Sequence, residues 1–399
     1  QSNMSKQAIP GGSLLIMGGG DSLVKELIAA DIEKNGIDIL TGNFTSKEDA
    51  LETFEKTGYS TGQLIYRAFI REDAMLTFDD FTGSPYRAAD SRQNVVLETR
   101  LTKNFPLNST IISANMQCTT GVDMLVEMAA TGNFGFYHQF DSDDDTEAAF
   151  MKLKNTQPEG YFDGERTYKP TLDSKGRLAG GMAMGVNGIT RERIARFYDQ
   201  NLIQALVVDA SHGDSPKMHE VVGDIKGWFP DLPLIAGNVV TSGGTNRMFS
   251  LTEFLEEIDA SYNEGADAVK IGVGPGARCT TRRVTGFGLP QASAIYFASV
   301  MGAYHEKEIM ADGGMSESGD MIKALACGAS TVMLGSVLAA TDSANLFNER
   351  VREKPGEPGV REVRIWGSAS DEGKNRSGRP AWDAREGKDD FVPYLGKTY

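Results

Sequence analysis

The sequence Ala205-Leu-Val-Val-Asp209 decides the fold, because its core is continuously apolar and short. A run of this kind is typical of a parallel strand that is covered on both faces. Seven more such runs occur from about residue 110 onward, each followed by a helical pattern. They are Ile111–Met116, Phe134–His138, Gly181–Val186, Pro233–Ala236, Ala268–Gly272, Glu308–Ala311 and Thr331–Leu334. Eight strands that alternate with helices predict an α/β fold of the closed (β/α)₈ type, a TIM barrel.

A doubly wound open sheet would show the same alternation of strands and helices. Folds of that class often carry Gly-x-Gly-x-x-Gly after their first strand, and no such motif occurs early in this chain. The closed barrel is therefore the preferred prediction.

Several segments do not fit a bare barrel. Residues 1–3, which precede Met4, are interpreted as the scar of a cleaved tag, and residues 4–75 as an N-terminal extension. Residues 76–399 are expected to form the catalytic barrel domain. Within it, the polar segment 141–177 predicts an insertion after the second strand, and the Gly-, Pro- and charge-rich segment 350–399 predicts a mobile flap. We predict no strongly apolar helix after the eighth strand, so the sequence leaves open how the barrel closes.

The composition restricts the classes of partner that the protein can bind. The formal net charge is −15 and the pI is about 4.9, which argues against nucleic acid or a membrane surface as a general partner. The chain has no apolar run of membrane-spanning length. Its cysteines, Cys118, Cys279 and Cys327, are too few and too scattered for a disulfide framework or a zinc site. A cytoplasmic location is the simplest expectation, since thiols stay reduced there.

The most informative segment is Gly272-Val-Gly-Pro-Gly-Ala-Arg-Cys279-Thr-Thr-Arg282, which directly follows an apolar strand. Active sites of barrels lie at the carboxyl ends of the strands, so this loop is placed for catalysis. Its glycines let the backbone turn tightly and approach a ligand. A cysteine near backbone N–H groups and arginines is a candidate nucleophile. The alternative is that Cys279 is a small loop residue without chemistry.

Two further signals follow the seventh and eighth strands, Asp312-Gly-Gly314 and Leu334-Gly-Ser336. Barrels often bind a phosphate at this place through backbone N–H groups. Asp312 is a candidate acceptor for ribose hydroxyls. Tight turns between strand and helix would also explain the glycines, but not their matching position in two consecutive units.

Polar residues also follow the fourth and fifth strands, Asp209 and Asn238. A carboxylate at this rim is suited to hold a ribose or a nicotinamide amide. His212 is as consistent with a turn residue as with a base.

Together these motifs resemble the IMP dehydrogenase/GMP reductase family over about residues 76–396. Gly-x-Gly-Pro-Gly-x-x-Cys-Thr-Thr-Arg with downstream Asp-Gly-Gly and Leu-Gly-Ser is highly specific for it. Further matching motifs are Leu76-Thr-Phe-Asp-Asp80, Ser113-Ala-Asn-Met116, Glu386-Gly387 and Val392-Pro-Tyr394.

The resemblance implies an enzyme in which Cys279 attacks C2 of a purine 5′-monophosphate and forms a covalent intermediate. It implies that Thr281 and Glu386 handle the proton of the leaving or entering group. The expected nucleotide contacts are Ser113, Asn115, Asp312, Gly313, Gly314, Gly335, Ser336, Gly367, Ser368, Ala369 and Ser370. Residues expected to face the nicotinamide of NADPH or NAD⁺ are Asp209, Asn238 and Gly274. Carbonyls of Gly274, Gly276 and Cys279 would hold K⁺, and the family implies a homotetramer.

Reductase and dehydrogenase differ in the flap. Family dehydrogenases carry an adjacent Arg-Tyr pair there, whereas Asp371–Trp382 is short and has none, and Asn115 also resembles the reductases. The regulatory CBS module of many dehydrogenases is not expected, because the segment 141–177 is too short to hold it. These features favour a GMP reductase, with an IMP dehydrogenase as the alternative.

Other residues favour the alternatives. Thr77-Phe-Asp-Asp80 and Ser318-Gly-Asp320 look more like dehydrogenases. Gln117, Gln139 and Ala277 depart from the residues usual in both groups, namely Asp, Lys and Ser. A third hypothesis is therefore a nucleotide-binding barrel that has lost turnover.

Overall fold

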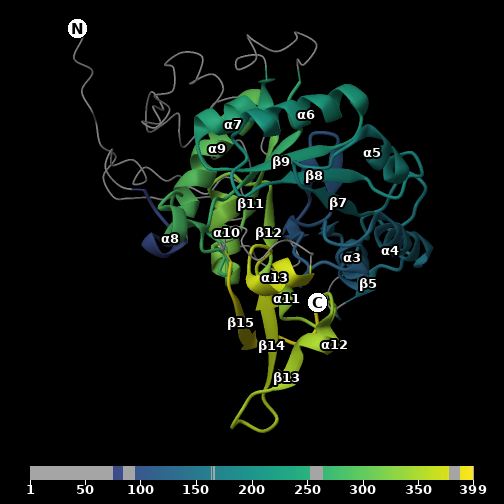
Figure 1. Ribbon diagram of the computed structural model, residues 1–399, viewed down its shortest axis with the longest axis vertical. Helices are drawn as coiled ribbons and strands as arrows, with labels where there is room; N and C mark the ends of the chain where they lie inside the picture. The colour runs from purple at the N-terminus through teal and green to yellow at the C-terminus, as the bar shows by residue number, and fades with distance from the viewer. Residues whose placement is uncertain are drawn as a thin grey trace.

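The computed structural model describes residues 75–83, 95–162, 164, 167–251, 264–376 and 387–398 (Figure 1). The N-terminal extension expected at 4–75 lies outside these residues except for Met75. Among the described residues, no helix has both the length and the apolar character needed to cross a membrane.

Eight parallel strands form the predicted closed barrel, in the spatial order β10-β11-β12-β3-β4-β7-β8-β9. All eight predicted runs coincide with strands. β9 extends three residues beyond its predicted end at Ala236. The strands are β3 (Ile111–Ser113), β4 (Phe134–Tyr137), β7 (Gly181–Met184), β8 (Ala205–Asp209), β9 (Leu234–Val239), β10 (Ala268–Ile271), β11 (Glu308–Asp312) and β12 (Thr331–Leu334).

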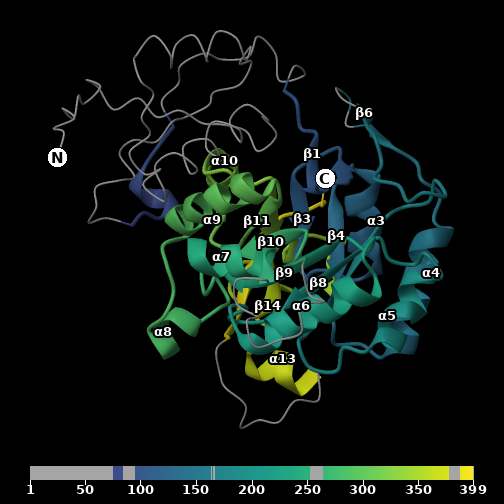
Figure 2. The same cartoon turned by 90° about the horizontal axis from the view of Figure 1, so that it is seen from above.

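Helices surround the barrel, as the view from above shows (Figure 2). They are α3 (Val122–Ala130), α4 (Asp143–Asn155), α5 (Arg191–Tyr198), α6 (Pro216–Trp228), α7 (Ser242–Phe249), α9 (Gln291–His305), α10 (Ser318–Ala326) and the short α11 (Ser336–Ala339). Several begin at a side-chain cap: Ser142, Thr190, Ser215 and Thr241 each accept a hydrogen bond from the backbone N–H three residues on. Such caps satisfy N–H groups that have no partner inside the helix, and so fix where each helix begins.

A β-hairpin closes the amino-terminal end of the barrel, which the sequence left unexplained. It consists of β1 (Thr99–Thr102) and β2 (Phe105–Leu107), paired antiparallel. Leu101 and Leu107 join the apolar cluster of the barrel interior. Arg100 forms an ion pair of 3.2 Å with the buried Glu308 at the start of β11. The barrel itself closes through the parallel pairing of β12 with β3, and the hairpin covers one end of it.

The segment predicted as an insertion begins later than expected. Helix α4 takes up residues 143–155, so its first part belongs to the regular barrel pattern. The remaining residues include a small hairpin of β5 (Tyr161–Phe162) and β6 (Thr167–Tyr168). The acidic residues 143–145 belonged to the predicted insertion, but they lie in the first turn of α4, where negative charge is favourable.

The C-terminal segment is more regular than the mobile flap that its composition predicted. β13 (Val351–Glu353), β14 (Arg361–Trp366) and β15 (Asp389–Pro393) form an antiparallel sheet that extends away from the barrel (Figure 1). Three short helices complete the described elements: α8 (Thr281–Thr285), α12 (Phe347–Arg350) and α13 (Asp371–Arg376), besides a 3₁₀ turn, η2 (Phe78–Asp80). The Gly and Pro residues of this segment lie mainly in its turns. Residues 377–386 of the predicted flap lie outside the described part of the chain.

Candidate active site

A pocket of about 410 Å³ opens at the carboxyl ends of the barrel strands. Its walls come from the loops after six of these strands and from the C-terminal segment. Most residues expected at the site line it: Asn115, Asp209, Asn238, Gly274, Gly276, Cys279, Thr281, Asp312, Gly313, Gly314, Gly335, Ser336, Gly367, Ser368 and Ala369. The structure thus brings together residues that are up to 254 positions apart, from Asn115 to Ala369.

Cys279 is exposed in this pocket, at the end of the glycine-rich loop that follows β10. Its Sγ lies 3.1 Å from Oγ1 of Thr281. Its backbone N–H donates to the carbonyl of Gly276 at 2.9 Å, which closes a tight turn. An accessible thiol with a hydroxyl at hydrogen-bond distance is the arrangement that a cysteine nucleophile needs, with a partner for its proton.

Arg282 braces the cysteine loop from behind. Its Nε donates to the carbonyl of Val273 at 2.9 Å, and its second guanidinium N–H group reaches the carbonyl of Leu289. Gly274 and Gly288 approach the aliphatic part of this side chain, and a Cβ at either position would come within 2.7 Å of its Cγ. Both glycines also have positive φ, so two independent constraints require them.

The C-terminal segment holds the cysteine loop from the other side. Cys279 forms an antiparallel bridge with Gly387, and the N–H of Lys388 donates to the carbonyl of Arg278 at 3.0 Å. The Arg278 guanidinium lies 3.4 Å from the carboxylate of Asp390 on β15. The sheet is therefore part of the site rather than an appendage.

A charged network spans the barrel mouth, with the buried Lys270 at its centre. The Lys270 ammonium lies 2.8 Å from Asp209 Oδ1 and 2.5 Å from Asp312 Oδ2. Asn115 donates to the other oxygen of Asp209 at 2.9 Å, and Asn238 donates to Asp312 at 3.1 Å. Four of these residues were expected at the site, but Lys270 was not. A lysine in an otherwise apolar strand, two residues before the glycine-rich loop, was the sequence signal that could have indicated it.

Burial and charge act in opposite directions in this network. Burial disfavours the charged form of Lys270, yet the two carboxylates more than offset this effect and raise its pKa. Burial likewise opposes the charge of Asp209, but Lys270 and Asn115 outweigh it and lower the pKa of this carboxyl. Lys270 and Asp209 therefore stabilise each other's charged form.

Asn238 offers an acceptor to a ligand. Its Nδ2 is engaged by Asp312 and by the carbonyl of Gly272, while its Oδ1 is buried without a hydrogen-bond partner among the described residues. A buried acceptor without a donor is costly, so a ligand that supplies an N–H or O–H group would stabilise it. This chemistry fits the amide or ribose of a nicotinamide nucleotide.

Three expected site residues do not line the pocket. Ser113 is fully buried and accepts a hydrogen bond from Thr120 at 2.9 Å. The prediction that it lines the phosphate is corrected, because side chains alternate along β3 and Ser113 faces the surrounding helices. Ser370 is also buried, and its hydroxyl accepts from the N–H of Gly373. Glu386 lies outside the described residues, although the adjacent Gly387 pairs with Cys279.

The three residues that depart from the family pattern differ in whether they line the pocket. Ala277 lines the pocket, whereas Gln117 does not, is buried, and keeps its Oε1 without a partner among the described residues. Gln139 lies beside Gly185, outside the pocket lining. His212 is exposed and is also absent from the lining, which agrees with a turn residue.

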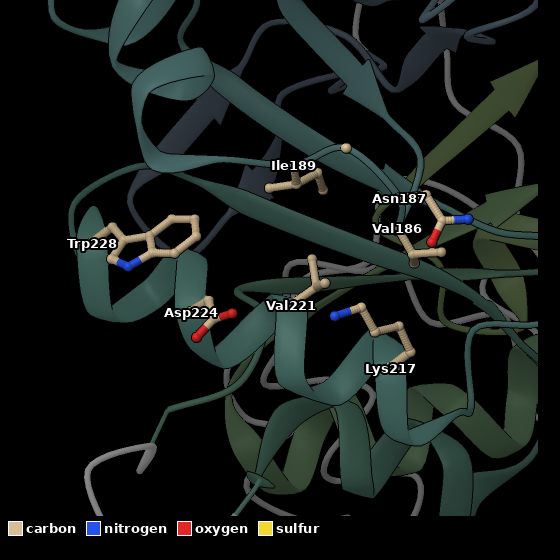
Figure 3. A pocket seen from close by; sticks show the side chains of 8 residues that line it. Val186, Asn187, Ile189, Lys217, Val221, Asp224 and Trp228 are labelled. Atoms are coloured by element: carbon tan, nitrogen blue, oxygen red, sulfur yellow. The ribbon is translucent and has the colours of Figure 1, made fainter.

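A second, smaller pocket of about 160 Å³ lies outside the barrel mouth (Figure 3). One wall is the face of α6 that carries Lys217, Val221 and Asp224, and the other is the loop after β7 with Val186 and Ile189. It contains none of the expected site residues. Elsewhere, the described residues hold no group of three or more His, Cys, Asp or Glu side chains suited to a metal ion.

A closed (β/α)₈ barrel carries an exposed cysteine, two carboxylates and several glycine turns at its mouth. The profile described as "IMP dehydrogenase / GMP reductase domain" matches residues 75–357. The chain belongs to this family, and its class of enzyme is a purine nucleotide oxidoreductase.

Individual relatives agree with this assignment. The chain is 35% identical to inosine-5′-monophosphate dehydrogenase of Cryptosporidium parvum, over 67% of this chain and 69% of that protein. It is 30% identical to the enzyme of the same name from Borreliella burgdorferi, over 81% and 85%. It is 42% identical to inosine-5′-monophosphate dehydrogenase of Aquifex aeolicus, but over only 48% of this chain and 39% of that protein.

Proposed function

We propose that the protein is a GMP reductase, which converts GMP and NADPH to IMP, ammonia and NADP⁺. The observation that carries this proposal is the short connection beside the cysteine. Helix α13 ends at Arg376, and Gly387 already pairs with Cys279, so ten residues, 377–386, connect them. Their sequence contains no tyrosine, and hence no Arg-Tyr pair to activate water for hydrolysis.

The chemistry of the site suits this reaction. The Cys279 thiolate forms a bond to C2 of GMP, and the C2–N bond breaks as the amine takes up a proton and leaves as ammonia. NADPH, when bound, supplies the hydride that C2 then accepts. The C–S bond breaks next, which releases IMP and returns the thiolate. Thr281, whose Oγ1 lies 3.1 Å from the sulfur, would pass a proton to the leaving amine. The sequence offers Glu386 as a second group for this role.

The ligands follow from the pocket. Gly313, Gly314, Gly335 and Ser336 would bind the 5′-phosphate through backbone N–H groups, and Asp312 the ribose. Asp209 and Asn238 would face the nicotinamide. Carbonyls of Gly274, Gly276 and Cys279 share one loop and suit a hard cation such as K⁺, although the Gly276 carbonyl also accepts the Cys279 N–H. A homotetramer in the cytoplasm completes the proposal.

An IMP dehydrogenase is the second candidate, because the relatives named above are inosine-5′-monophosphate dehydrogenases. In that direction, IMP would lose its C2 hydride to NAD⁺, and water would then release XMP from Cys279. Arg376, or Arg379 in the connection 377–386, would have to serve as the activator of water.

Absorbance at 340 nm separates the two candidates. We expect a fall with GMP and NADPH and no rise with IMP and NAD⁺. The Cys279→Ala variant should lower the rate by at least about 10⁴-fold, because covalent catalysis is lost. A rise only in the second assay would establish the dehydrogenase, and silence in both would leave a nucleotide-binding barrel without turnover.

A further inference from the structure

Lys270 lies at an inward-facing position of β10. Ala268, two residues before it, belongs to the apolar cluster of the barrel interior, and side chains alternate along a strand. Lys270 therefore points into the barrel, one layer above Ala268. Gly237, its partner on β9, makes room, because a Cβ there would lie 2.8 Å from the Lys270 Cβ.

The surroundings of this ammonium are unusual for a surface or a core lysine. Met310, the register partner of Lys270 on β11, belongs to the apolar cluster of the barrel interior. Above the ammonium lie the carboxylates of Asp209 and Asp312, at 2.8 and 2.5 Å. The Lys270 side chain is only 3% exposed, so solvent does little to screen these two interactions.

The two carboxylates serve different walls of the pocket. Asp312 ends β11 and lies beside Gly313 and Gly314, whereas Asp209 ends β8, on the far side of β9 and β10. Lys270 and Asn238 both engage Oδ2 of Asp312, which leaves Oδ1 of this residue available to a ligand. Without a cation between them, two carboxylates and an incoming phosphate would repel one another.

We propose that Lys270 is a positioning residue for both subsites at once: its ammonium fixes Asp312 for the ribose of the purine nucleotide and Asp209 for the nicotinamide cofactor. The inference rests on the proposed function for the identity of the two ligands. It adds a residue that acts by ordering the acceptors for both ligands.

The test measures binding without turnover. Isothermal titration gives the Kd of GMP and, separately, of NADP⁺ for the wild type, Lys270→Met and Lys270→Arg. We expect Lys270→Met to weaken both ligands by at least about tenfold, the loss of one charge-assisted contact in each subsite. Lys270→Arg keeps the charge, so it should restore both Kd values to within about threefold of the wild type. Lys270→Gln, which keeps an N–H donor but no charge, replaces the Met variant if that variant does not fold.

Lys154→Met is the matched control. Lys154 is likewise buried and paired with an aspartate, Asp173 at 3.2 Å, but it lies outside the pocket. Its loss should lower stability and leave both Kd values unchanged. The proposal is overturned if Lys270→Met affects one ligand alone or neither, if the arginine fails to rescue, or if the control shows the same loss.

The proposed function is decided separately, by the 340 nm assay on the wild type. If that assay shows a dehydrogenase, IMP and NAD⁺ replace GMP and NADP⁺ in the titrations. The ratio of variant to wild-type Kd then still tests Lys270.

Discussion

Gly274 shows how the absence of one Cβ can shape the cysteine loop. Its φ is +74°, and an added Cβ would lie 2.6 Å from Cγ of Arg282. Gly274→Ala should therefore cost about 1–2 kcal/mol for the left-handed backbone and about 1–3 kcal/mol more for the contact. Arg282 holds the loop in place, so its displacement should also shift Cys279. The activity of the variant should therefore fall by about 100-fold. Urea denaturation and initial rates measure the two effects.

Gly176 provides the control for this substitution. It has the same φ of +74°, but no atom lies within 4 Å of an added Cβ. Gly176→Ala should show the backbone cost alone and full activity. Equal losses of stability in the two variants would refute the role given to the contact with Arg282.

Lys154 ties helix α4 to the chain that returns to β7. Its ammonium contacts Asp173 at 3.2 Å and donates to the carbonyl of Leu178 and to Gln204. Burial lowers the pKa of Lys154 to about 8, against the opposing effect of Asp173. Arg177, at 3.0 Å, still pairs with the Asp173 carboxylate in the Lys154→Met variant. The variant removes the buried donor to Leu178 and Gln204, so we expect a loss of about 1–3 kcal/mol of unfolding free energy. Urea denaturation checks this value.

The control is Lys152, which lies on the exposed side of the same helix. It pairs with Asp123 at 2.8 Å, but both side chains are exposed. Lys152→Met should leave the urea midpoint unchanged, since exposed pairs contribute little. A double variant, Lys154→Met with Asp173→Asn, should recover part of the loss. No recovery would mean that the cost does not come from the lost pairing between Lys154 and Asp173.

The sequence predicted the barrel because its strands are short apolar runs, and such runs can be recognised from neighbouring residues alone. It predicted most of the pocket because parallel strands in a barrel end at one rim, so that Asp209, Cys279 and Asp312 had to meet. Segments whose order depends on distant partners were harder to predict. The hairpin β1–β2 is stabilised by the barrel interior, and β14–β15 by the pairing of Cys279 with Gly387.

Lys270 was missed for a related reason. Its neighbours Val269 and Ile271 are apolar, so the sequence of the strand reads as apolar as a whole. Only the structure shows that the Lys270 side chain points into the barrel, where its ammonium meets Asp209. The expectation for Ser113 differed from the structure because side chains alternate between the two faces of β3, and Ser113 lies on the face away from the pocket. Which face of a strand a residue occupies depends on the register of the whole barrel, and a motif match does not carry that information.

Ligand binding should stabilise the barrel as one unit, because the pocket joins loops from six of its strands to the C-terminal segment. A nucleotide at 100 times its Kd adds about 2.7 kcal/mol to the unfolding free energy. For a chain of this size we expect the thermal midpoint to rise by roughly 3–5 °C with GMP or IMP. Guanosine lacks the phosphate that we assign to Gly313 and Gly335, so it should give a much smaller shift. AMP, which carries an amino group at C6 where GMP and IMP carry a carbonyl, should do likewise. If guanosine and GMP gave equal shifts in differential scanning calorimetry, the assignment of the glycine turns to the phosphate would be wrong.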